Sequence, residues 1–269
     1  MPYTKLHLES LSEGYNATHF LWKDSEFYGL KQLSFHSFDN AFKRSVKQHL
    51  RLGQLAEQFA LDELKQHPDI KILAENVQIK AQKQTLGELD ALIKINQEFF
   101  HVEMVYKFYL YDVSLGKAEI NRWVGPNRND SLIQKIQKLK THQLPLLYSD
   151  ACRQQLSKLN IYTNHFKQRV WFKAQLFVPY GMKAEFNHLN SNCIEGFYIS
   201  IDSLDTFDKY LFYLPSKIDW LLKPNLNKDW KSFKEILPEI MKFIAVKKSP
   251  LLWIKTSDKS LHKCFVVWW

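Results

Sequence analysis

The sequence is poor in the residues that build flexible hinges, disulfide frameworks and membrane spans. Glycine occurs only 8 times, and there is no internal repeat or low-complexity linker, so flexible hinges should be few. The three cysteines are far apart and form no CxxC pair, which predicts reduced thiols and no zinc site. No apolar run approaches the roughly 18 residues of a membrane helix.

Motifs that define several large enzyme classes are also missing. The chain has no Walker A loop, no Rossmann glycine fingerprint, no HExxH and no GxSxG. These absences weigh against ATPases, dehydrogenases, zinc proteases and serine hydrolases. Residues 1–24 carry acidic side chains and lack the apolar stretch of a signal peptide. We therefore expect a soluble, cytoplasmic protein with no membrane partner.

What the sequence does have is an ordinary globular composition with an excess of positive charge. Hydrophobic residues make up 45% and charged residues 24%, which is enough apolar material for a real core. The net charge of +9 suits a polyanionic partner such as nucleic acid, although solubility alone explains it equally well. The excess is spread along the chain and forms no long basic block.

Apolar periodicity predicts an α/β fold with a mixed sheet covered by helices. Helices are expected over residues 45–66, 131–141, 150–158 and 230–246. Strands are expected over residues 70–80, 85–95, 99–109, 170–179, 197–201, 251–255 and 264–268. We divide the chain into an N-terminal helical segment (1–45), a core (46–180) and a C-terminal α/β extension (181–269) that packs on the core in one compact unit.

Two acidic residues face each other in the hairpin predicted for residues 85–109. The shortest hairpin loop is the pair 96–97, and asparagine is favoured in such loops. In that register Asp90 lies opposite Glu103, with their Cβ atoms about 5 Å apart. A loop one residue longer would mix the polar and apolar faces, so alternation supports the shorter loop.

Like charges directly opposite each other destabilise a sheet, and a divalent cation is the simplest reason to keep this pair. Mg²⁺ prefers carboxylate oxygens, lowers the pKa of a bound water and neutralises charge that builds on a phosphate. Lys107, on the same face as Glu103, would stabilise that charge as well. A solvated polar face on a half-exposed hairpin explains the same residues without any metal.

The run Gly87-Glu88-Leu89-Asp90, followed by His-Val-Glu-Met-Val-Tyr-Lys at 101–107, resembles the D…(D/E)xK signature of the PD-(D/E)xK nuclease superfamily. The preceding Gly-Gln-Leu-Ala-Glu at 53–57 resembles the helix that carries the auxiliary glutamate of that superfamily. Over most of its length, and most strongly over 53–130, the chain is also similar to an uncharacterised bacterial domain-of-unknown-function family placed in that superfamily.

This resemblance implies a restriction-endonuclease-like mixed β-sheet core flanked by helices, which would occupy residues 46–180. It implies Asp90 and Glu103 as ligands of Mg²⁺ or Mn²⁺, and Glu57 as an outer or water-mediated ligand. It also implies that Lys107 lies near the attacking water.

The lysine departs from the superfamily pattern. The motif lysine lies two residues after the acidic residue, where this chain has Val105. Lys107 starts roughly 13 Å along the strand from Glu103. A bulge near residues 104–106 would bring it closer. Otherwise Lys135 or Lys138 on the next predicted helix would take its place.

Basic residues at and beyond the loop 125–130 are candidates for contacts with a nucleic-acid backbone. The loop opens a helix, and helix N-termini favour phosphate, which makes Arg128 a candidate. Lys135 and Lys138 on that helix would track the backbone. A capped turn and a solvated helix face explain these residues equally well.

Three functions are consistent with these sequence features. The leading hypothesis is a Mg²⁺- or Mn²⁺-dependent phosphodiesterase acting on DNA or RNA, with Asp90, Glu103 and Lys107 as its catalytic residues. The second is a nuclease-like module that binds nucleic acid without cutting it, which the displaced lysine favours. The third is a structural or partner-binding protein whose basic charge serves solubility.

Overall fold

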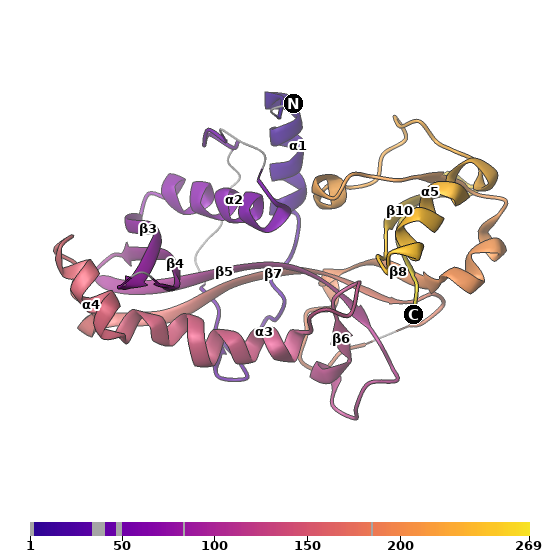
Figure 1. The fold of residues 1–269 in the computed structure, drawn as a ribbon. Coiled ribbons are helices and arrows are strands. Elements are labelled where there is room, and N and C mark those ends of the chain that lie inside the picture. The colour runs from indigo at the N-terminus through magenta and orange to yellow at the C-terminus, as the bar shows by residue number, and fades with distance from the viewer. Residues whose placement is uncertain (1–2, 34–40, 47–49, 83, 184) are drawn as a thin grey trace. The chain divides into compact units, whose positions relative to one another are not determined.

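A computed structural model gives the fold and describes residues 3–33, 41–46, 50–82, 84–183 and 185–269. Its strands form a large mixed sheet in the order β3-β4-β5-β7-β8-β11-β10-β9, with β6 paired to β5, and helices flank the sheet (Figure 1). The predicted α/β class is confirmed. No helix in the described ranges has the length and apolar character needed to cross a membrane. All three cysteines are buried and unpaired.

The chain forms two compact units that share its elements. Unit 1 comprises Met1–Ser12, Trp22–Tyr106 and Gln134–Lys173, and unit 2 comprises Glu13–Leu21, Lys107–Ile133 and Ala174–Trp269. Helix α1 (Lys5–Asn16) and the long strands β5 (Glu98–Tyr111) and β7 (Phe166–Pro179) contribute residues to both units. The units are therefore discontinuous in sequence, whereas the predicted ranges 1–45, 46–180 and 181–269 follow the chain.

Unit 1 is a sheet covered on both faces. Its other elements are β1 (Glu26–Phe27), β2 (Leu30–Lys31), α2 (Leu52–Gln66), β3 (Ile70–Ala81), β4 (Gln84–Ile95), α3 (Leu132–Lys138) from Gln134 on, and α4 (Asp150–Ser157). Helix α2 lies on one side of β3, β4 and β5, and helices α3 and α4 lie on the other (Figure 1). Leu89 and Leu92 of β4 pack with Leu156 of α4 in one apolar cluster. Because both faces are covered, this hairpin is not the half-exposed element that strand alternation suggested.

Helix α2 begins later than the predicted residue 45. Its N-cap is Arg51, whose backbone N–H donates to the Gln54 side chain at 3.1 Å, and the buried stripe starts at Leu52. Residues 41–46 are not helical, and residues 47–49 lie outside the described part of the chain. The backbone N–H of Lys43 instead donates to Asp62 of α2 at 3.0 Å. The preceding segment therefore pairs with the helix and does not extend it.

The predicted register of the β4–β5 hairpin is confirmed. The antiparallel ladder runs from Ile95 opposite Glu98 to Ala91 opposite Val102, which leaves the pair 96–97 as the loop. Asn96 has a φ of 54°, in the left-handed region that asparagine tolerates better than most residues. The register puts Asp90 and Glu103 at the next position of the pair of strands.

Helix α3 changes pitch before the predicted residue 141. It continues as a π-helical turn, η2 (Leu139–Gln143), and then as a 3-10 helix, η3 (Leu144–Tyr148). Pro145 lies in the first turn of η3; a proline lacks the N–H of the α-helical ladder and its ring clashes with the carbonyl four residues back. Pro145 therefore ends α3 and sets the position of Gln143.

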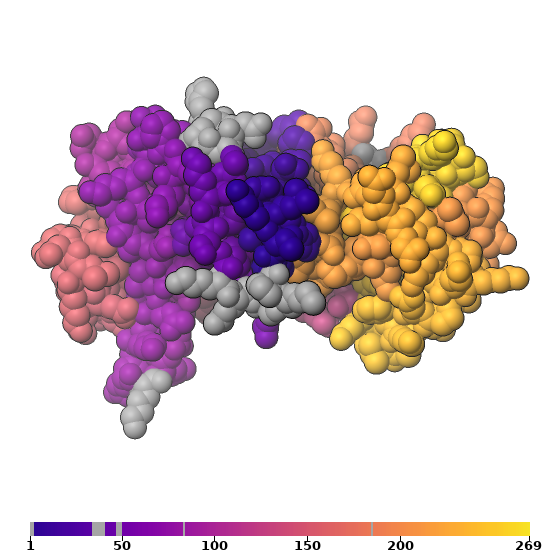
Figure 2. All heavy atoms as spheres, turned by 90° about the horizontal axis from the view of Figure 1, so that it is seen from above, coloured from indigo at the N-terminus to yellow at the C-terminus, as the bar shows by residue number. Residues whose placement is uncertain are grey.

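Unit 2 carries the remaining strands and the last helix. They are β6 (Trp123–Val124), β8 (Ile194–Ser200), β9 (Leu211–Tyr213), α5 (Phe233–Ala245), β10 (Leu251–Lys255) and β11 (Leu261–Val267). Strand β11 pairs parallel to β8 and antiparallel to β10. Helix α5 packs Ile236 and Ile240 into the core of this sheet. Residues from about 200 onward, coloured orange to yellow, form one continuous body in Figure 2.

Candidate metal centre

Asp90 and Glu103 meet where the β4–β5 ladder ends. Asp90 Oδ2 accepts the backbone N–H of Met104 at 2.7 Å. The Glu103 carboxylate in turn accepts the backbone N–H of Asp90. Each carboxylate thus accepts a backbone N–H of the neighbouring strand, at the place where a backbone carbonyl of the ladder would otherwise accept it. The structure brings together the pair that strand alternation predicted.

Both carboxylates are withdrawn from water. Glu103 is fully buried, with 0% of its surface exposed, and Asp90 is half-buried. A solvated polar face therefore does not describe this position. A buried carboxylate is costly unless it is neutral, paired or bound to a metal.

Burial and mutual repulsion raise the pKa of three carboxyl groups to about 7. Burial is the main cause for each of them. The charge of Glu103 adds to the rise for Asp90, and the charges of Asp90 and Glu88 add to the rise for Glu57. Near neutral pH these groups oppose one another's ionisation, which a cation among them would relieve.

Glu57 reaches this cluster from helix α2. It is half-buried, and the Asn76 side chain donates a hydrogen bond to it. Across the described ranges, no three or more His, Cys, Asp or Glu side chains are grouped so as to hold a metal by themselves. The charges of Asp90 and Glu103 help to raise the pKa of Glu57, and its outer-ligand role stays a prediction.

Lys135 and Gln143 connect helix α3 to the buried glutamate. Lys135 Nζ donates to Gln143 Oε1 at 2.6 Å, and Gln143 Nε2 donates to Glu103 Oε2 at 2.5 Å. The Lys135 ammonium also acts to lower the pKa of both Asp90 and Glu103. Lys135, predicted as a nucleic-acid contact and as the alternative to Lys107, therefore belongs to the carboxylate cluster.

Gln143 was not predicted as a site residue from the sequence. It is neither acidic nor basic and lies beyond the predicted end of its helix at residue 141. The signal that could have found it is Pro145, which implies a disturbed helix just before it. Single π-helical turns inside helices are frequent at functional sites.

His101 holds the other oxygen of Glu103. Its Nε2 lies 3.1 Å from Glu103 Oε1, and the histidine is fully buried. Burial lowers the pKa of His101 to about 4, so the ring is neutral near pH 7, and Nε2–H donates when Glu103 is ionised. Its Nδ1 is buried with no hydrogen-bond partner among the described residues. His101 and Gln143 together fix the orientation of the Glu103 carboxylate.

The other predicted site residues have partners elsewhere or lie at the surface. Lys107 Nζ donates to Asp130 Oδ2 at 2.6 Å, and both residues belong to unit 2. Arg128 pairs with Asp112 and stacks 3.9 Å from the ring centroid of Trp269, also in unit 2.

Lys138 is exposed on α3. Because α3 spans only 7 residues, its N-terminus offers little support for the predicted phosphate contact.

Comparison with known proteins identifies a family for this chain. The family model described as "Domain of unknown function (DUF1853)" matches residues 32–264. No curated protein and no solved structure gives a significant match. The matched range runs through both units and includes every residue of the carboxylate cluster. The chain therefore belongs to the DUF1853 family.

Proposed function

We propose that this protein is a Mg²⁺- or Mn²⁺-dependent nuclease of the PD-(D/E)xK type, in which Asp90 and Glu103 hold the metal. The observation that carries the proposal is the buried pair of adjacent carboxylates whose pKa values are both raised to about 7. Strongly shifted pKa values in buried groups that lack a full counter-charge are typical of functional sites.

The residues present fit a hard divalent cation. Two carboxylates from neighbouring strands offer oxygen ligands, and Mg²⁺ commonly takes one or two carboxylates and keeps several waters. Glu57 would then interact through one of those waters. When bound, the ion supplies an activated water and neutralises negative charge on a phosphate.

The chain's own residues have separable roles in this proposal. His101 and Gln143 hold Glu103 in one orientation, as partners behind metal ligands commonly do. Lys135 supplies the positive charge that the superfamily lysine would provide, and its bond to Gln143 keeps its ammonium near the two carboxylates. Lys107 is committed to Asp130, so we assign the role to Lys135.

The second candidate function is a nuclease-like module that binds nucleic acid without cutting it. The ion pair between Lys107 and Asp130 favours it, because the lysine expected on the strand is engaged outside the cluster. This module would show metal-independent binding and no turnover. The basic net charge of +9 supports a nucleic-acid partner for both candidates.

The first test is thermal unfolding with and without millimolar Mn²⁺. Wild type should gain about 3 kcal/mol if the metal is at 100 times its dissociation constant, which raises the midpoint by roughly 5 to 10 °C. Asp90→Asn/Glu103→Gln should not respond. Its metal-free midpoint at pH 8 should exceed that of wild type, because the repulsion between the carboxylates is gone.

The matched control is Asp69→Asn/Glu98→Gln, which removes the same charge from exposed positions of unit 1. It should keep the full response to Mn²⁺. An equal response of all three proteins would remove Asp90 and Glu103 from the proposed metal site. If wild type and the control respond and Asp90→Asn/Glu103→Gln does not, cleavage assays on single- and double-stranded DNA and RNA decide between the nuclease and the binding module.

A further inference from the structure

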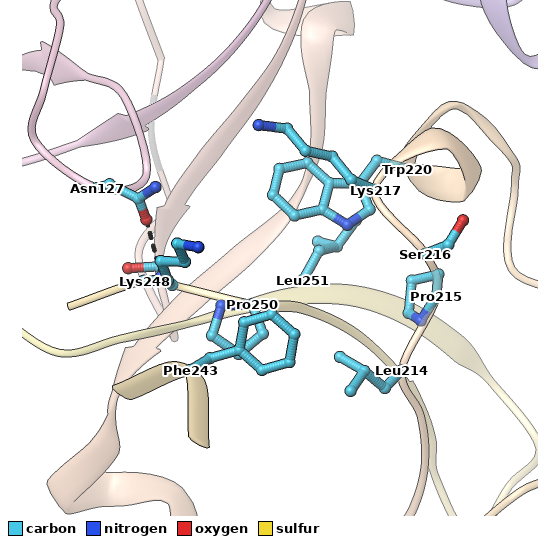
Figure 3. A pocket seen from close by; sticks show the side chains of 11 residues that line it. Asn127, Leu214, Pro215, Ser216, Lys217, Trp220, Phe243, Lys248, Pro250 and Leu251 are labelled. Carbon is cyan, nitrogen blue, oxygen red and sulfur yellow. Dashed lines mark hydrogen bonds between the residues drawn. The ribbon is translucent and has the colours of Figure 1, made fainter. Parts of the chain in front are cut away.

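Unit 2 contains a cavity of about 260 Å³ at the C-terminal end of helix α5. Trp220 and Phe243 lie on opposite sides of it, and Pro250 and Leu251 also line it (Figure 3). Asn127 borders it and accepts the backbone N–H of Ser249 at 2.8 Å, which ties the loop after β6 to the strand entering β10. The cavity is thus apolar and bordered by aromatic rings.

The Trp220 side of the cavity is firmly built. The Trp220 ring meets Phe108 and Phe265 edge to face, with ring centroids 5.3 and 5.0 Å away. Its backbone carbonyl accepts a hydrogen bond at 3.0 Å from Lys263, whose side chain is almost fully buried. The indole is therefore held in place before any ligand binds, which reduces the ordering cost of binding.

Positive charge surrounds the aromatic walls. Lys217 and Lys248 both line the cavity and are exposed, and Lys217 Nζ lies 5.6 Å from the Trp220 ring centroid. Residues 209–269 contain twelve lysines and only five acidic residues, so this stretch has a local net charge of +7.

We propose that this cavity binds one nucleotide of a single-stranded nucleic acid, with the base between Trp220 and Phe243 and its phosphate at Lys217 and Lys248. Aromatic walls with adjacent cations are the usual way to bind unpaired bases without sequence preference. A base in a duplex is stacked on its neighbours and cannot enter. The cavity is smaller than a typical drug-sized site, which suits one base. The inference stands on contacts of unit 2 and does not depend on the metal centre.

The test is fluorescence anisotropy of a labelled oligothymidylate with the full chain carrying Asp90→Asn/Glu103→Gln, in chelator. Neither metal nor cleavage then affects the result, so failure of the strand-binding proposal can be told apart from failure of the nuclease proposal. In this background Phe243→Ala should weaken binding about tenfold or more, while Phe243→Tyr keeps a stacking ring and binds normally. Phe243 is 37% exposed, so its truncation leaves the fold intact.

A charge-matched pair separates the cavity from general attraction. Lys217→Gln/Lys248→Gln should weaken binding and reduce the slope of log affinity against log salt by roughly 1.4. Lys234→Gln/Lys259→Gln removes the same charge from exposed positions that do not line the cavity. Equal effects of the two pairs, or no strand binding at all, would overturn the proposal. Free thymidine monophosphate binding as tightly as the strand would overturn its assignment to a strand.

Discussion

The two units treat charge in opposite ways. Unit 1 buries acidic groups, and Asp90, Glu103 and Glu57 all have pKa values raised to about 7. Unit 2 gathers lysines at the surface beside aromatic rings, as with Lys217 near Trp220 and Lys247 near Trp268. Buried like charges destabilise a fold until a counter-ion binds, whereas exposed charges attract a partner at long range.

The buried acids of unit 1 suit the proposed reaction, and the exposed lysines of unit 2 suit the proposed binding of a strand. A small set of acids held at fixed positions suits a reaction at one atom, because its groups are oriented before the substrate arrives. Exposed lysines over rings suit a flexible polyanion, because each contact is weak and replaceable.

The largest contrast should come from Lys135. Lys135→Met keeps the aliphatic stem and removes the charge beside the carboxylates, so cleavage should fall about 100-fold or more, as for other lost electrostatic stabilisers. Strand binding through unit 2 should not change. Lys138→Met, at an exposed position of the same helix, is the control and should cleave normally. If Lys107→Met instead abolishes cleavage and Lys135→Met does not, the role returns to the strand lysine.

A smaller effect is expected at Gln143. Gln143→Ala removes the hydrogen bond to Glu103 and the hydrogen bond from Lys135, so Mn²⁺ affinity should fall roughly 10- to 100-fold, the range for partners of metal ligands. Gln137→Ala, exposed on α3, provides the comparison. Affinity is read from the rise in unfolding midpoint across a Mn²⁺ titration. Identical titration curves for the two variants would show that Gln143 does not position Glu103.

The last effect, a pH-dependent shift in unfolding midpoint, should have opposite signs in the two units. The pKa values of Asp90 and Glu103 are raised to about 7 from 3.8 and 4.5, so between those values the folded chain binds more protons than the unfolded chain. The free energy of unfolding therefore falls as pH rises through that window. Burial lowers the pKa of Lys263 from 10.5 to about 8, so its contribution rises with pH between those values.

Unfolding midpoints measured without metal from about pH 4 to about pH 10 would show both trends. Asp90→Asn/Glu103→Gln should flatten the acidic window alone, and Lys263→Met should flatten the alkaline window alone. A double carboxylate variant whose midpoint still falls from acidic to neutral pH would show that other groups set the acidic trend.

Local pattern was enough to predict most of the sheet. The strand over 70–80 and the β4–β5 register followed from alternation and from the loop at Asn96, and both are confirmed. Helix ends were less predictable, because they depend on single side chains. Ser232 and Glu235 form a capping box that starts α5 at Phe233, three residues after the predicted start at 230.

The candidate site was predictable only in part. The pairing of Asp90 with Glu103 is a property of two neighbouring strands and could be read from sequence. The hydrogen bond from Gln143 to Glu103 could not be predicted, because the two residues are 40 positions apart in the sequence. The same holds for the bond from Lys107 to Asp130, which are 23 positions apart. Such contacts depend on how helices cover the sheet, which no local pattern specifies.

The division of the chain between its units has a consequence for obtaining either unit by itself. The boundaries after Ser12, Leu21, Tyr106, Ile133 and Lys173 mean that the polypeptide crosses between units five times. Neither unit can be cut out as one continuous fragment, so a truncated gene cannot supply either half alone. Gene fusion or exchange would have to transmit both together, and the family match across residues 32–264 includes both.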